Sequence, residues 1–178
     1  DINPNKALSV NLTNSGESKL YARLSARTQP QVGVDQEPVE GRFRMSVQYV
    51  ALNGDPLNVE SLSQGTEFTA VVTVQNSIEQ AFTDLALTQV FPSGWEVFNE
   101  RMLEADTSGS NGGYSYRDIR DDRVLTYFNL GAGETKRFVV RLQAAYRGNY
   151  YLPPVSCQAM YAPQEEARNR GMWVKVVE

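Results

Sequence analysis

The residues of this chain that could carry chemistry are a single cysteine and several acidic side chains. Cys157 is the only cysteine, and the 178-residue sequence contains no histidine. The absence of histidine removes Ser-His and Cys-His nucleophile pairs, imidazole proton shuttles and histidine metal ligands. A single cysteine also excludes a disulfide bond within the chain. We therefore expect that the chain is not an enzyme and that it has no catalytic residues.

An acidic run is the strongest candidate for a metal site. Asp118, Asp121 and Asp122 offer the hard oxygen ligands that Ca²⁺ prefers. Three arginines interleave with them, and cations so close offset the negative field that a metal ion needs. These arginines are Arg117, Arg120 and Arg123. The sequence therefore favours ion pairs at the entrance of a strand, and we expect neither a metal nor a cofactor.

Two further acidic residues lie next to each other near the end of the chain. Glu165 and Glu166 would have to converge to act as the acid and base of a glycosidase-type reaction. Side chains of adjacent residues diverge, so the pair is a weak signal for catalysis. The surrounding segment, Gln164–Asn169, is compatible with one helical turn.

The elements that position these residues are short strands with a period of two. Alternation of apolar and polar side chains indicates half-buried antiparallel strands. Turn sequences separate these strands, and no longer helical periodicity is present. The pattern predicts an all-β fold, an antiparallel β-sandwich of fibronectin-like or immunoglobulin-like architecture. The predicted strands are Arg42–Val50, Glu67–Gln75, Leu85–Phe91, Val124–Leu130, Lys136–Ala145, Tyr150–Leu152, Val155–Tyr161 and Gly171–Val177.

The N-terminal part of the chain reads as a separate piece. Within residues 1–28, two alternating stretches flank a turn at residues 14–17 and predict a β-hairpin. Two strands alone are marginally stable, so this hairpin is expected to complete a preceding β domain. Residues 29–41 contain two prolines and two glycines and are read as a linker. The sandwich is then assigned to residues 42–178.

Composition narrows the classes of partner. The net charge is −4 and no basic block is present, which argues against nucleic-acid binding. No apolar run approaches the roughly 20 residues needed to span a bilayer. The start, DINPNKAL, has no signal-peptide pattern and reads as internal or processed.

One long run carries a resemblance to a known family. Residues 118–163 read DIRDDRVLTYFNLGAGETKRFVVRLQAAYRGNYYLPPVSCQAMYAP, and residues 91–97 read FPSGWEV. The run begins with acidic and basic residues that precede a strand with an aromatic pair. A Gly-rich turn and a long Arg-rich strand follow. The run then has a G-x-Y-x-LPP step and ends in a strand with the pattern A-M-Y-x-P. This order resembles the last macroglobulin-like domain of bacterial alpha-2-macroglobulins.

The resemblance implies a function that belongs to a larger protein. That protein would be a broad-specificity protease trap in the periplasm or on the cell surface, with an internal thioester at a C-x-E-Q motif. Protease cleavage of a bait region would expose the thioester, which then captures the protease. Here the sequence at Cys157 is CQAM, without that motif, so Cys157 is expected to be a buried apolar residue. The chain alone would be an inert monomer that packs on the thioester domain.

Two tyrosines are the candidate contact residues with the thioester domain. In the family, aromatic residues of the C-terminal domain help shield the thioester, and the matching segment here, GGYSYR, contains Tyr114 and Tyr116. If the segment is extended, both rings share one face. Rigid rings of this kind cover much area at a small entropic cost. The alternative is that one or both tyrosines simply close the end of the sandwich.

A rival hypothesis is a stand-alone adhesive or carbohydrate-binding sandwich. Trp95 and Trp173 would then stack on sugar rings. Glycan-array binding by the isolated chain would favour this rival. A C-x-E-Q motif upstream in the full-length gene would favour the protease trap.

Overall fold

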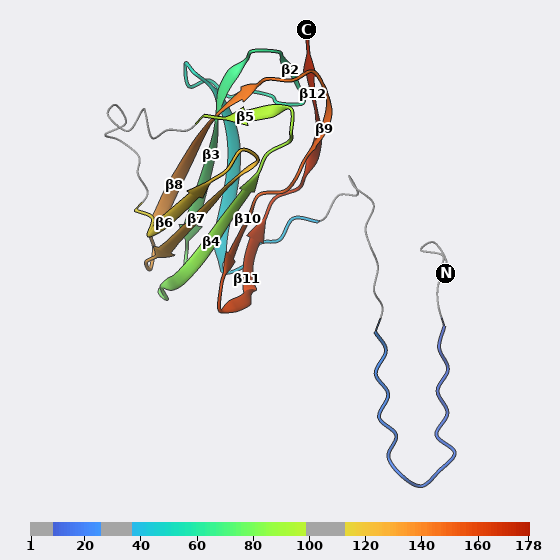
Figure 1. Cartoon of the computed structure of the whole chain (residues 1–178). Helices are drawn as coiled ribbons and strands as arrows, with labels where there is room; N and C mark the ends of the chain where they lie inside the picture. Colours follow the sequence, from blue (N-terminus) through green and yellow to red (C-terminus); the bar gives the residue numbers. More distant parts are fainter. Residues whose placement is uncertain (1–8, 26–36, 99–112) are drawn as a thin grey trace. The chain divides into compact units, whose positions relative to one another are not determined.

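The computed structural model describes residues 9–25, 37–98 and 113–178. The chain divides into two units, Asp1–Pro30 and Gln31–Glu178. Within the described residues the regular elements are twelve β-strands, and all of them belong to the second unit (Figure 1). The same residues contain no helix with the length and apolar character needed to cross a membrane.

Two antiparallel sheets form the body of the second unit. The four-stranded sheet has the order β1-β3-β8-β5, and the five-stranded sheet has the order β11-β10-β4-β7-β6. The strands of the first are β1 (Phe43–Ala51), β3 (Glu67–Asn76), β8 (Thr135–Ala144) and β5 (Trp95–Val97). Those of the second are β4 (Phe82–Val90), β6 (Tyr116–Ile119), β7 (Arg123–Leu130), β10 (Ser156–Ala159) and β11 (Ala162–Arg168).

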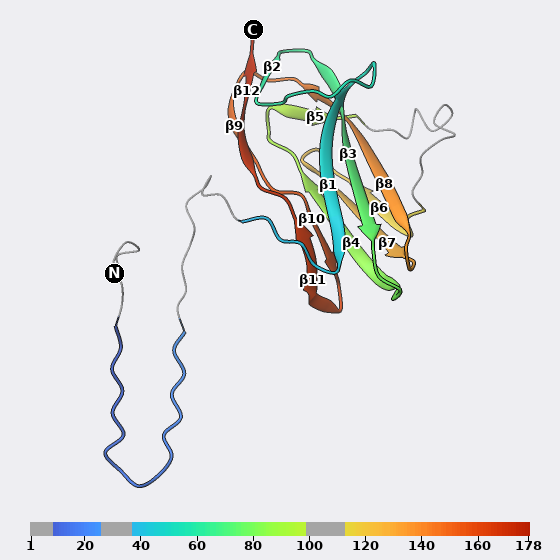
Figure 2. The ribbon, with the colours of Figure 1, turned by 180° about the vertical axis from the view of Figure 1, so that it is seen from behind.

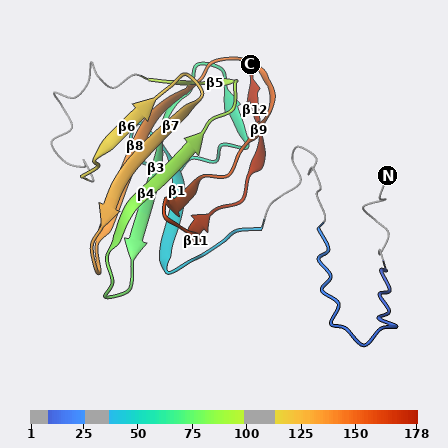
Figure 3. The ribbon, with the colours of Figure 1, turned by 60° about the horizontal axis from the view of Figure 1, so that its bottom comes forward.

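A small third sheet lies at one end. Its order is β2-β12-β9, with β2 (Ser61–Ser63) parallel to β12 (Met172–Val177) and β9 (Gly148–Leu152) antiparallel to β12. The five-stranded sheet is in front in Figure 1, and β1, β3 and β8 are in front in Figure 2, which is turned by 180°. Figure 3 shows the two layers from another side. The predicted all-β sandwich is therefore confirmed.

The core is built from the inward positions of the alternating strands. Each long strand buries every second side chain against the facing sheet, as period-two patterning requires. These buried positions are Phe68, Ala70, Val72 and Val74 on β3, Val124, Thr126, Phe128 and Leu130 on β7, and Phe138, Val140, Leu142 and Ala144 on β8.

The buried side chains form two clusters. The first core cluster consists of Phe43, Val72, Val74, Phe82, Leu85, Leu87, Phe128, Leu130, Phe138, Val155, Cys157, Ala159 and Ala167. The second core cluster consists of Val59, Leu62, Phe68, Ala70, Phe91, Trp95, Val124, Val140, Leu142, Ala144, Leu152, Val174 and Val176. Strands β3 and β8 contribute to both clusters, so they connect the two halves of the core.

Three aromatic rings organise the second core cluster. The rings of Phe68 and Trp95 meet edge to face with centroids 4.9 Å apart. Tyr49 on β1 packs edge-on against both, at 6.2 Å from Phe68 and 5.9 Å from Trp95. Such edge-to-face pairs add to the stabilisation from burial itself. The strand pair β1-β3 and the short strand β5 are thereby tied to one cluster.

The residues before β1 are attached to the outer edge of β11. Val39 and Arg168 exchange two backbone hydrogen bonds of 2.9 and 2.8 Å. The Arg170 guanidinium donates to both carboxylate oxygens of Glu37 at 3.1 Å. A Cβ at Gly41 would come within 2.7 Å of the Glu166 carbonyl oxygen, so this close approach requires glycine. The incoming chain thus covers part of an edge that would otherwise be unpaired.

Four strands were not predicted from the sequence. The segment expected to allow one helical turn, Gln164–Asn169, lies largely within strand β11, which pairs with β10. Its buried residues, Glu165 and Ala167, follow a period of two, but the charge of Glu165 hides that pattern. Strands β2, β5 and β6 were also missed, because three or four residues are too few to show periodicity.

The first unit differs from the predicted hairpin. The expected turn is present, since the Asn14 side chain accepts a hydrogen bond from the Gly16 amide at 3.0 Å. Over residues 9–25, however, the structure has no strand on either side of this turn. The apolar side chains Val10, Leu12, Leu20 and Leu24 are all exposed. A hairpin without further strands has nothing against which to bury such a face.

Phe68→Ala tests the role of the aromatic cluster. We expect the free energy of unfolding to fall by about 3–5 kcal/mol, because a fully buried ring is lost and leaves a cavity. Urea denaturation followed by tryptophan fluorescence measures the change. Tyr161→Ala, at an aromatic residue that is 83% exposed, is the control and should change stability by less than about 0.5 kcal/mol. Equal losses in both variants would contradict this account of the core.

Candidate functional site

The β6-β7 hairpin carries the candidate contact residues at one edge of the five-stranded sheet. Tyr116 begins β6 and lies opposite Tyr127 of β7. The two rings are 5.9 Å apart with an interplanar angle of 32°, and Tyr116 remains 60% exposed. Tyr127 therefore supports one face of the Tyr116 ring and leaves much of the rest to solvent. Tyr127 was missed in the sequence, although it lies at an outward position of its strand.

Tyr114 lies differently from Tyr116. The chain bends at Ser115, whose amide donates a 2.7 Å hydrogen bond to the Tyr127 carbonyl oxygen. Tyr114 is partly buried and packs against the first core cluster. We expected both tyrosines to share one face if the segment were extended. The bend at Ser115 means that the segment is not fully extended. Tyr114 acts as an anchor of the segment, whereas Tyr116 is its exposed ring.

Two cationic side chains fix this segment to the facing sheet. The Arg117 guanidinium donates a 2.7 Å hydrogen bond to the Val139 carbonyl oxygen on β8. The Lys136 ammonium, also on β8, donates to the Gly113 carbonyl oxygen at 2.7 Å. Both contacts join the edge of one sheet to a strand of the other. The exposed Tyr116 therefore lies on a hairpin that hydrogen bonds hold to the facing sheet.

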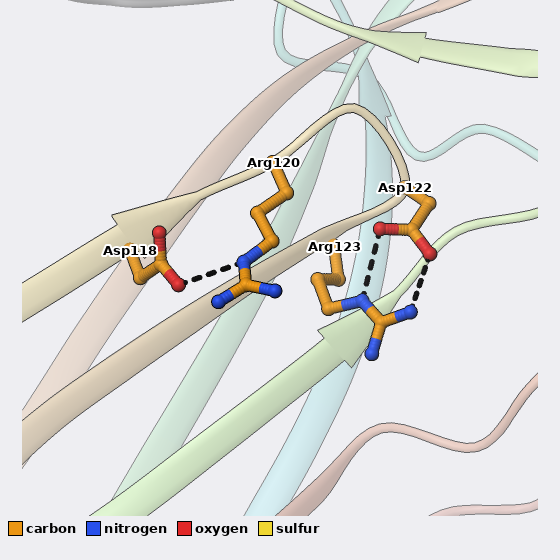
Figure 4. Close-up of polar contacts among 4 residues, drawn as sticks. All are labelled: Asp118, Arg120, Asp122 and Arg123. Carbon is orange, nitrogen blue, oxygen red and sulfur yellow. Dashed lines mark hydrogen bonds and ion pairs between the residues drawn. The ribbon is translucent and has the colours of Figure 1, made fainter.

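The acidic run forms ion pairs at the turn between β6 and β7 (Figure 4). Arg120 donates to Asp118 at 2.9 Å. Arg123 makes a two-fold contact with Asp122, with bonds of 2.9 and 2.6 Å. These hydrogen bonds from Arg123 hold the pKa of the Asp122 carboxyl below its ordinary value. The prediction of ion pairs is confirmed for these residues.

The described residues contain no group of three His, Cys, Asp or Glu side chains that could hold a metal ion. The two carboxylates of the acidic run that face arginines already accept charged donors, and Asp121 is exposed in the turn between them. These ion pairs lie on either side of the turn between β6 and β7. The run acts as a structural element of the hairpin that carries Tyr116.

Glu165 and Glu166 have separate partners. Glu165 is buried, and its carboxylate accepts a 2.8 Å hydrogen bond from Arg42. Glu166 accepts instead from Arg168 at 3.2 Å. The hydrogen bond from Arg42 lowers the pKa of the Glu165 carboxyl. The divergence expected for adjacent residues is thus observed, and the contact ties the start of β1 to β11.

Cys157 lies in the first core cluster. It is fully buried on β10, between Leu87 of β4 and Ala167 of β11. Burial raises the pKa of its thiol to about 12, so the reactive thiolate is scarce at neutral pH. Val155 and Ala159 on the same face are buried as well. The expectation of a buried apolar residue is confirmed.

The two tryptophans differ in exposure. Trp95 is buried in the second core cluster, so it cannot stack on a sugar ring as the carbohydrate-binding hypothesis requires. Trp173 is 55% exposed and meets Tyr151 edge to face at 5.7 Å. The hypothesis of a pair of sugar-stacking tryptophans is therefore wrong for Trp95.

Fold and surface together define a β-sandwich domain whose candidate site is an aromatic contact edge. The sequence profile described as "Bacterial Alpha-2-macroglobulin MG10 domain" matches residues 43–164. This match covers more than half of the chain. The chain belongs to the bacterial alpha-2-macroglobulin MG10 domain family, as its sequence resemblance predicted.

Curated relatives extend the match beyond the sandwich. The alpha-2-macroglobulin homolog of Yersinia pestis is 24% identical over 166 residues, which span 79% of this chain and 8% of that protein. The alpha-2-macroglobulin of Xylella fastidiosa (strain Temecula1) is 26% identical over 172 residues, 88% of this chain and 10% of that protein. The chain therefore spans about a tenth of the length of the relatives it matches.

Solved structures show the same fold. The native conformation of Escherichia coli alpha-2-macroglobulin, determined by electron cryomicroscopy, superposes with a TM-score of 0.73 at 18% identity, over 84% of this chain and 10% of that one. Salmonella alpha-2-macroglobulin reacted with methylamine superposes with a TM-score of 0.70 at 23% identity, over 80% of this chain and 10% of that one.

The reactivity of Cys157 tests its burial. We expect the native chain to react with a thiol reagent such as DTNB at least about a hundredfold more slowly than the urea-unfolded chain, because the thiol is buried and protonated. Absorbance of the released thiolate measures the rate. Cys157→Ser gives the background. Rapid stoichiometric labelling without denaturant would show that this face is exposed.

Glu165→Gln tests the ion pair with Arg42. Because the folded-state pKa of Glu165 is lowered, the pair stabilises the fold above the unfolded-state pKa of glutamate, about 4.3. This contribution is lost as the pH falls through the lower folded-state pKa. Urea denaturation should therefore show the variant less stable than the parent at about pH 7, and the two should converge towards about pH 3.

The exposed Glu60 provides the control for this experiment. Glu60→Gln should track the parent in stability at both ends of the pH range. A difference between Glu165→Gln and the parent that stays constant from neutral to acidic pH would rule out the ionised pair as its source.

Proposed function

We propose that the chain is the C-terminal, non-catalytic domain of a bacterial alpha-2-macroglobulin-like protease trap. In this role it packs on the thioester domain of the same protein and keeps the reactive bond covered until a target protease cuts the bait region. Membership of the MG10 family supports the assignment to such a protein. The lack of histidine in the chain supports a role in binding rather than catalysis.

The observation that carries the shielding role is the exposed ring of Tyr116. An aromatic side chain that is 60% exposed has much apolar area to bury against a partner. The ring is held by Tyr127 beneath it and by the β6-β7 ladder, so little conformational entropy is lost when it binds. Tyr114 contributes by anchoring the segment in the core. The covering residue is thus Tyr116, and Tyr114 positions it.

The proposed setting is the periplasm or the bacterial cell surface, where a trap meets foreign proteases. The chain by itself is a monomer. It does not inhibit proteases, because CQAM at residues 157–160 is not a C-x-E-Q motif. Inhibition therefore requires the full-length protein. The shielding tyrosine and the thioester belong to different domains, so a substitution can remove one and leave the other unchanged.

Tyr116→Ala in the full-length protein tests the shield. A lost interface hot spot costs about 2 kcal/mol or more, which corresponds to a roughly thirtyfold shift towards the uncovered state. We expect thioester loss to methylamine, measured before any protease is added, to accelerate by about that factor. Tyr114→Ala should accelerate it less, since Tyr114 acts through the position of the segment.

Tyr146→Ala is the matched control, because Tyr146 is similarly exposed at 56% but lies outside the β6-β7 hairpin. It should react with methylamine at the parental rate. If Tyr114→Ala, Tyr116→Ala and the double variant all react no faster than the parent, the shielding role is refuted. The tyrosines then only close the end of the sandwich.

A further inference from the structure

Strand β6, which carries Tyr116, is the outermost strand of the five-stranded sheet. Among the described strands it pairs with β7 alone, over four residues on each strand. An edge strand has backbone pairing on one side and opens more readily than a central strand. A second attachment would therefore fix the side chains of β6 more firmly than pairing with β7 can.

Two neighbouring residues of β6 point in opposite directions. Side chains alternate between the two faces of any strand. Tyr116 is on the outer face and is 60% exposed. Arg117 is half-buried on the inner face, which it shares with Ile119, a residue packed against the second core cluster. The exposed ring and the guanidinium are therefore carried on opposite sides of one short strand.

The Arg117 guanidinium reaches the edge of strand β8, which lies beside β6 in Figures 1 and 3. Strand β5 pairs with the C-terminal end of β8, and the Phe98 amide then donates to the Arg141 carbonyl oxygen at 3.0 Å. Alternate residues of an antiparallel strand direct their backbone groups to the same side. The next carbonyl group in this row belongs to Val139, and it accepts from Arg117 at 2.7 Å. Arg117 thus continues the row of hydrogen bonds beyond the end of β5.

This contact joins the two sheets at a partly buried position. A hydrogen bond from a charged donor is stronger than one between neutral groups. A buried carbonyl group that loses its donor also retains the cost of its desolvation. Removing the guanidinium would therefore detach β6 from β8 and leave the Val139 oxygen with one bond fewer.

The second contact with β8 holds a different part of the segment. Lys136 donates to the Gly113 carbonyl oxygen, three residues before Tyr116. The bend at Ser115 lies between Gly113 and Tyr116, so the lysine holds the incoming chain rather than strand β6. Arg117 belongs to the same strand as the ring and is adjacent to it.

We propose that Arg117 is the positioning residue for Tyr116. Its hydrogen bond to Val139 holds β6 against β8 and thereby keeps the exposed ring where it covers the thioester. This inference rests on the shielding role proposed above for Tyr116. Arg117 acts through the tyrosine, because its guanidinium bonds inside the domain whereas the ring faces outward.

Methylamine reactivity of the full-length protein tests this proposal. Arg117→Met keeps the apolar stem and removes the donor, so it should accelerate thioester loss about fivefold to tenfold. Arg117→Lys keeps a cationic donor and should accelerate it less than about threefold. Arg117→Met combined with Tyr116→Ala should react no faster than Tyr116→Ala alone, because both substitutions act through one ring.

Arg42→Met is the matched control. Arg42 also joins the two sheets, through Glu165 of β11, at the edge of the sandwich formed by β1 and β11. The variant loses a contact between sheets of the same kind and should react with methylamine at the parental rate. Equal acceleration in Arg42→Met and Arg117→Met would show a general loosening of the domain and would overturn the proposal.

Amide hydrogen exchange of the 178-residue chain gives a second measurement. The Ser115 amide, which donates to Tyr127, and the amides of β6 should exchange at least about fivefold faster in Arg117→Met. They should exchange at the parental rate in Arg42→Met. Unchanged exchange in Arg117→Met would contradict the proposal even where that variant reacts faster with methylamine.

The same variants separate this inference from the shielding role. If Tyr116→Ala accelerates the reaction with methylamine and Arg117→Met does not, Arg117 is not the positioning residue and the shielding role stands. If Tyr116→Ala has no effect, the shielding role fails and the inference fails with it. A double variant that reacts faster than Tyr116→Ala alone would show that Arg117 acts on the thioester by another route, which also overturns the proposal.

Discussion

The antiparallel pairing of β3 with β8 is the contact on which the rest of the domain depends. These strands form nine registered residue pairs, from Glu67–Gln143 to Gln75–Thr135. β3 carries β1 on its other side, and β8 carries β5. Their inward side chains enter both core clusters. The two halves of the core therefore share these two strands, together with β7, and the outer strands of the four-stranded sheet pair onto β3 and β8.

The sequence predicted the long strands well and the short or charged ones poorly. Residues such as Phe68, Val72 and Phe138 recur with a period of two over whole strands, so the fold class and the inward faces could be read directly. β11 was missed because Glu165 occupies a buried position, and only the distant Arg42 makes that burial acceptable. A partner more than a hundred residues away leaves no local pattern.

The candidate site shows the same limit. The residue types at Tyr114 and Tyr116 pointed to a contact surface, but their relative orientation depends on a bend at Ser115 and on the ring of Tyr127. Neither is visible in a six-residue motif. The position of β1 as the last strand of its sheet was likewise not predictable, because edge position is a property of sheet order rather than of strand sequence.

The attachment of the incoming chain to β11 has a mechanical consequence. Two backbone hydrogen bonds between Val39 and Arg168, together with the side-chain contacts of Glu37 and Arg42, attach this stretch to β11 and the residues after it. None of them belongs to the core clusters, so tension on the N-terminal side would break them before the sandwich opens. Release of residues 37–41 would lengthen the tether by up to about 17 Å, at roughly 3.3 Å per extended residue. The segment before β1 can therefore detach from β11 and extend while the β-sandwich remains folded.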